Sequence, residues 1–182
     1  VAYEALANRK DFFGCDLNPV ATLIARTKCR KYDSNEINRC FIRIKALFFS
    51  DDIDADEYFG KNTRICYWFY PKQVYDLYKL RFSIISVVEN EIYLDFFLCA
   101  FSSILKGCSK WLTKSIKPQI DPRKQAKDVW EEFCRQIQKM QRANETSEVC
   151  EENNAEILTR SVLDLNINEP FVDLLVTSPP YV

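Results

Sequence analysis

Three stretches in the middle of the chain repeat apolar residues at intervals of three and four, with polar residues between them. This spacing gathers the apolar side chains on one face of an α-helix, because a helix turns once in about 3.6 residues. We therefore predict three core-facing helices. Their apolar stripes are Val74, Leu77, Leu80, Ile84 and Val88; Ile92, Phe96, Phe97, Ala100, Phe101 and Ile104; and Ala126, Val129, Trp130, Phe133, Ile137 and Met140.

The two ends of the chain show a different pattern. Residues 2–9 are good helix formers, residues 11–17 are a short apolar run typical of a buried strand, and Pro19 stands in the first turn of a helix that Asn18 can cap. Near the other end, "EILTRSVLDL" and "FVDLLVTSPPY" are typical of strands, and the second has the continuous apolar run of a central parallel strand. Strands that alternate with helices predict an α/β fold.

These patterns divide the chain into three expected parts. Residues 1–49 form the first part of an α/β core, residues 50–150 form a mainly α-helical insertion, and residues 151–182 return to the core with two strands. Within the insertion, residues 50–70 are acidic and then aromatic, and we expect them to be irregular. The stretch "KGCSKWLTKSIKPQIDPRKQ" holds two prolines and most of a basic run, so it is expected to be a surface loop.

Composition argues against several classes of site. The chain has no histidine, which removes the usual general base and the usual Ser and Cys triads. Its three glycines exclude a glycine-rich phosphate loop within these residues. None of its eight cysteines belongs to a CxxC pair, so we expect no metal site. With no signal peptide and no apolar run of membrane-spanning length, the cysteines are expected to be reduced thiols of a cytoplasmic protein.

Charge is balanced overall but unevenly distributed. The chain has 25 Lys and Arg against 26 Asp and Glu, yet Lys106 to Lys127 holds seven basic residues and one acid. Asp51 to Glu57, by contrast, holds five acids and no base. Such runs are usually solvated surface. A basic run can also contact the backbone phosphates of a nucleic acid, and at this point both interpretations stay open.

The stretch "FFGCDLNPVA" places an acid where a strand ends. In a doubly wound sheet, the carboxyl ends of the strands border the crevice in which nucleosides bind, and a carboxylate there can accept both hydroxyls of a ribose. Asp16 occupies that position. The alternative is that Asp16 only caps the following helix, although Asn18 can serve as the cap instead.

The last strand ends in Ser-Pro-Pro-Tyr, residues 178–181. Pro179 and Pro180 fix the backbone and lack N–H groups. We therefore expect the carbonyls of Ser178 and Pro179 to be held rigidly and not to be needed for hydrogen bonds to a neighbouring strand. An exocyclic amine of a base is a weak nucleophile until fixed acceptors hold its hydrogens, and Tyr181 could stack on a base flipped from a duplex. A simple proline-rich turn after a core strand is the alternative.

Together, "FGCDLNPVATLIARTK" and "DLLVTSPPYV" resemble motifs of the DNA amino-methyltransferases of restriction–modification systems, which use S-adenosylmethionine. The resemblance implies a partial Rossmann-like methyltransferase sheet with a helical insertion. It implies that Asp16, with Asn18 beside it, binds the cofactor, and that Ser178, Pro179, Pro180 and Tyr181 form the target-amine pocket. "SVLDL" resembles a third motif of the family, which would put Asp164 near the cofactor's adenine.

The resemblance further implies methylation of cytosine at N4 or adenine at N6 in double-stranded DNA, with the base flipped out. A serine preceded by threonine is the form most often seen in the cytosine enzymes. The middle of the chain is similar to a helical insertion in a subset of bacterial DNA methylases, where a basic loop could contact DNA phosphates. The candidate contacts are Lys114, Lys117, Arg123 and Lys124.

The chain also departs from the family's pattern. The glycine-rich first motif is absent, and the chain ends directly after the tyrosine, so we expect this polypeptide alone to bind the cofactor poorly and to be inactive. An incomplete sheet would leave edges open to self-association. Two other functions stay open: an RNA guanine-N2 methyltransferase, and a degenerate methyltransferase-like subunit that serves as a scaffold or DNA-binding partner.

Overall fold

The computed structural model describes residues 1–51, 53, 63–112, 114, 117–165 and 172–177, which fall into two compact units. Residues 1–30 and 148–182 belong to a unit that mixes helices with strands, and residues 31–147 form a helical unit. Helices and strands are thus both present, as the sequence predicts, and the described strands all lie in the mixed unit.

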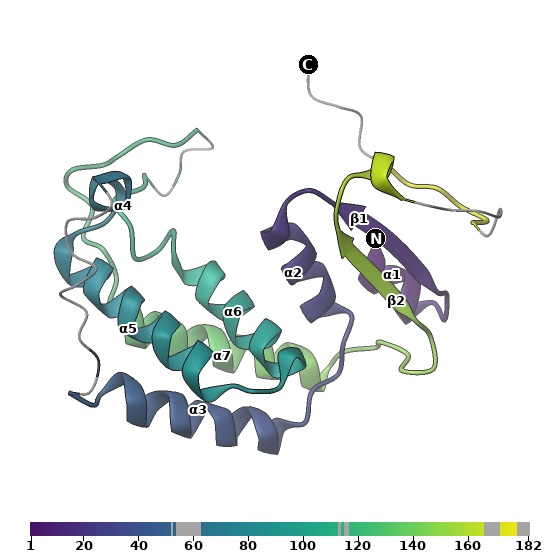
Figure 1. The fold of residues 1–182 in the computed structure, drawn as a ribbon, viewed down its shortest axis with the longest axis horizontal. Helices are drawn as coiled ribbons and strands as arrows, with labels where there is room; N and C mark the ends of the chain where they lie inside the picture. Colours follow the sequence, from purple (N-terminus) through teal and green to yellow (C-terminus); the bar gives the residue numbers. More distant parts are fainter. Residues whose placement is uncertain (52, 54–62, 113, 115–116, 166–171, 178–182) are drawn as a thin grey trace. The chain divides into compact units, whose positions relative to one another are not determined.

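The mixed unit is built on a pair of parallel strands, β1 (Phe12–Asp16) and β2 (Ala155–Thr159). Their register pairs Phe12 with Ala155 and Asp16 with Thr159, so both strands end at the same edge. Helix α1 (Ala2–Ala7) precedes β1, α2 (Pro19–Lys28) follows it, and a single 3-10 turn, η2 (Val162–Asp164), follows β2 (Figure 1). Parallel strands require a long connection between them, and here the whole helical unit lies in that connection.

Both helices of the mixed unit cover one face of the strand pair. Leu6 of α1, Cys29 at the end of α2 and Val149 form a small buried cluster, against which Ala155 and Ile157 of β2 pack. Alternate residues of a strand point to the same face, so Thr159 lies on this face too. Its hydroxyl is 2.7 Å from that of Thr22 on α2, which fixes the start of α2 against the end of β2.

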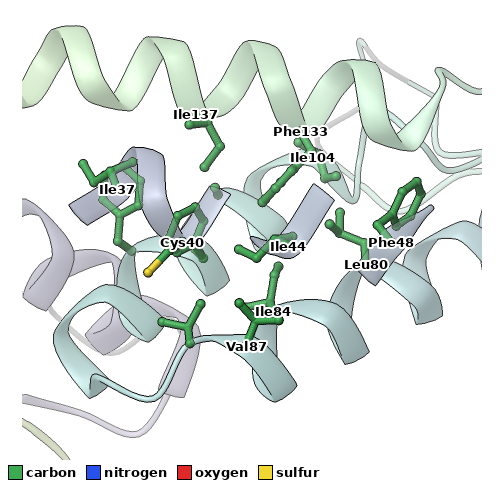
Figure 2. Packing of buried hydrophobic residues seen from close by; sticks show 14 of the residues in the cluster. Ile37, Cys40, Ile44, Phe48, Leu80, Ile84, Val87, Ile104, Phe133 and Ile137 are labelled. Carbon is green, nitrogen blue, oxygen red and sulfur yellow. The ribbon is translucent and has the colours of Figure 1, made fainter. Parts of the chain in front are cut away.

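Among its described residues, the helical unit has five helices, four of which surround one apolar core. They are α3 (Ser34–Phe48), α4 (Thr63–Trp68), α5 (Pro71–Val87), α6 (Glu91–Ile104) and α7 (Val129–Glu145). Figure 2 shows side chains from four of these helices meeting in the core. The labelled residues are Ile37, Cys40, Ile44 and Phe48 of α3, Leu80, Ile84 and Val87 of α5, Ile104 of α6, and Phe133 and Ile137 of α7.

The three predicted helices are confirmed as α5, α6 and α7, and most residues of their stripes are buried or half-buried, whereas Ile92 is 42% exposed and Ala126 precedes α7. Polar caps set where several helices begin: Asp33, Asn90 and Asp128 each accept a backbone N–H from the first turn of α3, α6 and α7. Aromatic rings fill the space between α3 and α7, where Trp130 stacks on Phe41 and Phe48 at centroid distances of 5.5 and 4.9 Å. Local sequence therefore determines both the ends and the inner faces of these helices.

Three expectations about local structure differ from the fold. The strand expected over residues 156–165 ends at Thr159, and Val162–Asp164 forms the 3-10 turn η2. Residues 63–68, inside the stretch expected to be irregular, form α4. Residues 172–177 are not in a strand, and Leu174 and Leu175 are 78% and 79% exposed. A continuous apolar run becomes a central strand only where strands flank it and helices cover both faces, whereas the described part of the sheet consists of β1 and β2.

The boundary between the units also differs from the expected one. The first part of the mixed unit ends at residue 30 instead of 49, because α3 buries Ile37, Ile44 and Phe48 in the core of the helical unit. At the other end, the structure changes unit at residue 148, close to the expected residue 151.

Candidate functional site

The carboxyl edge of the strand pair is where the described candidate residues of the mixed unit follow the ends of the strands. Asp16 ends β1, and its register partner Thr159 ends β2. Asn18 and the start of α2 follow two residues after Asp16, while Arg160, Ser161 and η2 follow Thr159 directly. This edge is where parallel sheets place binding groups, because the loops that leave the strands converge there.

Asp16 is exposed at this edge and is held in place by the turn that follows it. Its Oδ1 accepts a hydrogen bond from the backbone N–H of Asn18 at 2.7 Å. The second carboxylate oxygen has no hydrogen-bond partner among the described residues. The carboxylate is therefore fixed through one oxygen and can offer the other to a hydroxyl group.

Asn18 serves as the cap of α2. Its Oδ1 accepts from the N–H of Val20 at 2.9 Å, and Pro19 stands at the first helical position. Capping by Asn18 was one of the two possibilities for this turn, and it leaves Asp16 outside the cap. The side-chain oxygen of Asn18 thereby accepts one hydrogen bond from the helix.

Asp164 is the last residue of η2 and is exposed. The turn is stabilised by Ser161, whose Oγ accepts from the N–H of Leu163 at 3.2 Å. Asp164 lies five residues beyond the end of β2, so the chain brings it to the carboxyl edge on the β2 side, while Asp16 and Asn18 occupy the β1 side.

The contact between Thr22 and Thr159 at this edge was not predicted from the sequence. Thr22 is buried, and its Oγ1 both donates to the carbonyl of Pro19 at 3.1 Å and meets the hydroxyl of Thr159. The two threonines are 137 positions apart, and neither belongs to a motif. Only the parallel pairing of β1 with β2 indicates that they meet.

Ser178, Pro179, Pro180 and Tyr181, the residues expected to form the target-amine pocket, lie outside the described residues. Residues 172–177, which precede them, are described and are exposed to solvent.

The candidate phosphate-binding residues belong to the helical unit, in the segment between α6 and α7. Lys114, Lys117 and Arg123 are exposed, whereas Lys124 is half-buried. The Lys124 ammonium donates to the carbonyls of Lys106 and Trp111, both at 2.8 Å. Burial lowers the pKa of this lysine from its ordinary value. The indole Nε1 of Trp111 is buried and has no acceptor among the described residues.

Cysteine chemistry has no organised site in the described part of the chain. All eight cysteines are free thiols, and no group of three or more His, Cys, Asp and Glu side chains there could hold a metal ion. Burial raises the pKa of Cys108 to about 11, so this thiol stays protonated at neutral pH. No helix among these residues is both long enough and apolar enough to cross a membrane.

Comparison with known proteins gives one relative. No family model and no solved structure matches the chain. The chain is 21% identical over 198 residues to a curated protein of Kocuria varians, the type II methyltransferase M.MvaI. The match takes in 98% of this chain and 43% of that protein, so this chain spans less than half of the relative's length. Along nearly all of its length, therefore, the chain is similar to part of a type II methyltransferase.

Proposed function

We propose that this chain is part of an S-adenosylmethionine-dependent DNA methyltransferase that modifies an exocyclic amine, N4 of cytosine or N6 of adenine. The observation that carries the proposal is the similarity to a type II methyltransferase over 98% of the chain. It is supported by the Ser-Pro-Pro-Tyr sequence and by an exposed carboxylate at the carboxyl edge of a parallel strand pair.

The carboxyl edge has the donor and acceptor chemistry that the ribose of this cofactor needs. Asp16 has one oxygen held by the Asn18 N–H, and its other oxygen is able to accept from a ribose hydroxyl. We assign Asp164 to the adenine side of the cofactor, because "SVLDL" resembles the family's third motif and η2 begins three residues after β2 ends. When bound, the cofactor supplies a methyl group on a positively charged sulfur, which passes directly to the target amine.

The target amine would be held by Ser178, Pro179, Pro180 and Tyr181. Carbonyl and hydroxyl acceptors at fixed positions can bind both amine hydrogens, which concentrates the lone pair on nitrogen, and the tyrosine ring can stack on the flipped base. In the methyl transfer, the amine nitrogen would form a bond to the methyl carbon as the carbon–sulfur bond breaks, and it would release a proton to solvent. The chemistry requires neither histidine nor a nucleophilic enzyme side chain.

An assay of radiolabelled methyl transfer tests the proposal. It uses the natural-length protein that contains this chain. We expect label in duplex DNA and not in transfer RNA, and nucleoside analysis will show N4-methylcytosine or N6-methyladenine. Labelling of guanine N2 in RNA, or no transfer to any nucleic acid, would contradict the assignment. Ser178→Ala and Tyr181→Ala should each abolish transfer while leaving cofactor binding unchanged.

A substitution at Asp16 tests the cofactor assignment separately. Asp16→Asn keeps an acceptor for the Asn18 N–H but removes the charge and one acceptor oxygen. A hydrogen bond to a charged group is worth about 1.5–3 kcal/mol, so affinity for S-adenosylmethionine should fall by roughly tenfold to a hundredfold. Calorimetry on the same protein measures this change. Glu4→Gln, an exposed carboxylate on α1, is the control, and an equal loss there would refute a specific role for Asp16.

A further inference from the structure

We infer that the segment between α6 and α7 binds the phosphates of duplex DNA. In this segment Lys110 and Lys124 stabilise the loop, and Lys114, Lys117 and Arg123 contact the phosphates. The inference rests on the proposed function for its choice of DNA, but it concerns binding and requires no methyl transfer. It divides one basic run into two roles that the sequence alone does not separate.

The loop is folded back on itself and attached to α4. Trp111 and Ile120 form an antiparallel bridge, and Leu112 donates its N–H to the carbonyl of Gln119 at 2.8 Å. The N–H of Lys110 donates to the carbonyl of Trp68 at 2.8 Å, and the rings of Trp68 and Trp111 lie 5.7 Å apart. Figure 1 shows α4 beside this segment. The loop therefore has a defined base on which charged side chains can be presented.

Two lysines act inside this structure through their ammonium groups. Lys124 donates to the carbonyls of Lys106 and Trp111, which closes the two sides of the loop. Lys110 donates to the carbonyls of Cys66 and Tyr67 at 3.1 and 3.3 Å, which ties the loop to the end of α4, and lies 5.0 Å from the centre of the Tyr70 ring. Carbonyls and rings satisfy an ammonium group without cancelling its charge, so the base of the loop stays electropositive.

The remaining bases point to an anionic polymer as the partner. Lys114, Lys117 and Arg123 are exposed, and Lys106 is exposed above the ring of Trp111 at 5.0 Å. Asp121 is the one acid between Lys106 and Lys127, and it accepts the N–H of Arg123 at 3.0 Å. Lys127 pairs with Glu132 at 3.0 Å. A row of phosphates offers several charges at short intervals, which suits three exposed bases in one loop.

The salt dependence of binding tests this inference. Binding of the 182-residue chain to a fluorescent 30-base-pair duplex would be followed by anisotropy between 50 and 200 mM salt, without methyl donor. The variant Lys114→Gln/Lys117→Gln/Arg123→Gln should reduce the slope of log K against log salt by about 0.9 for each lost phosphate contact, roughly 2.7 in all. At 50 mM salt its affinity should fall at least about tenfold.

A matched triple variant provides the control. Arg39→Gln/Arg43→Gln/Lys139→Gln removes three exposed bases from α3 and α7 and changes the net charge equally. It should keep the original slope. Equal losses in the two triple variants would show that net charge alone governs binding, and an unchanged slope in the loop variant would overturn the inference. Thermal unfolding followed by circular dichroism will show that both variants fold.

Lys124→Gln separates the two roles. It should lower the melting temperature of the helical unit, whereas the loop triple variant should not, because the Lys124 ammonium donates to carbonyls across the loop while Lys114, Lys117 and Arg123 are exposed. Tighter binding to an RNA duplex or an acidic polypeptide than to DNA would overturn the choice of partner. Failure of the methyl-transfer assay would leave these results unaffected, so the two proposals can fail independently.

Discussion

Asp128 shows how one carboxylate can secure two helices of the helical unit. Its Oδ1 accepts from the N–H of Glu131 and caps α7, while its Oδ2 accepts from Lys72 at the start of α5 at 3.3 Å. Burial by itself would raise the pKa of Asp128, but the hydrogen bonds from Glu131 and Lys72 overcome that effect and hold the pKa below its ordinary value. The ionised form is therefore favoured by folding.

Replacing Asp128 should destabilise the protein in a pH-dependent way. Because the folded pKa is depressed, the stabilisation is fully present above the unfolded pKa of about 3.9 and is lost as pH falls through the folded value. Asp128→Ala should lower the free energy of unfolding by about 1 kcal/mol at pH 7 and by less at pH 3. Urea unfolding at both pH values measures the difference. Asp128→Asn keeps the cap, so its loss at pH 7 should be smaller.

Residue-scale predictions from the sequence succeeded where the partner was close along the chain. Asn18 caps α2 because the acceptor and the N–H of Val20 are two residues apart. The bond between Thr22 and Thr159 and the closing of the loop by Lys124 depend on groups that only folding brings together. The roles of Asp16, Asn18, Asp164 and the Ser178–Tyr181 segment in binding stay predictions.

Helix α3 illustrates what a pattern indicates at the scale of one element. It begins at an Asp33 cap and buries Ile37, Cys40, Ile44 and Phe48 at helical spacing. The expected boundary at residue 49 placed these residues with the α/β core, whereas the structure packs them into the core of the helical unit. Periodicity identifies the buried face of a helix but not the core that this face joins.

Two isoleucines on α3 offer a matched test of that face. Ile44 is fully buried at 0% exposure, whereas Ile42, two residues earlier, is 66% exposed. Ile44→Ala should lower the free energy of unfolding by about 2–5 kcal/mol, because it removes buried methyl groups and leaves a cavity. Ile42→Ala should change it by less than about 0.5 kcal/mol. Denaturant unfolding compares them, and similar losses would contradict the assignment of the buried face.

At the scale of the whole molecule, hydrogen bonds join the first and last residues of the helical unit. The chain segments that begin and end the helical unit are bonded to each other. The side chain of Asn144 accepts the Tyr32 N–H at 2.9 Å and donates to the Tyr32 carbonyl at 2.8 Å. The ammonium of Lys31 donates to the carbonyls of Asn144 and Ser147. Residues more than a hundred positions apart thereby close the helical unit at its two ends.

Breaking this closure should loosen the ends of the helical unit. Tyr32 is 8% exposed, and Asn144→Ala removes two hydrogen bonds to its backbone, at a cost of about 1–3 kcal/mol. Hydrogen exchange measured by mass spectrometry should show faster exchange at Tyr32 and in the last turn of α7. The control is Gln141→Ala, which removes an exposed hydrogen bond to Asn38. If exchange at Tyr32 were unchanged by Asn144→Ala, the closure would not matter to stability.

The sequence by itself determined the helices α5, α6 and α7, the strands β1 and β2 and several of the caps, because helical periodicity, short apolar runs and capping residues act within a few positions of the chain. Tertiary structure decided which core α3 joins, that β1 pairs with β2 in parallel, and which lysines of the basic run hold its loop. It also decided that Val172–Thr177 is not a strand here. A strand needs a neighbouring strand, and a buried charged group needs hydrogen-bond acceptors or donors. When these partners are distant along the chain, only the packing of the whole molecule brings them together.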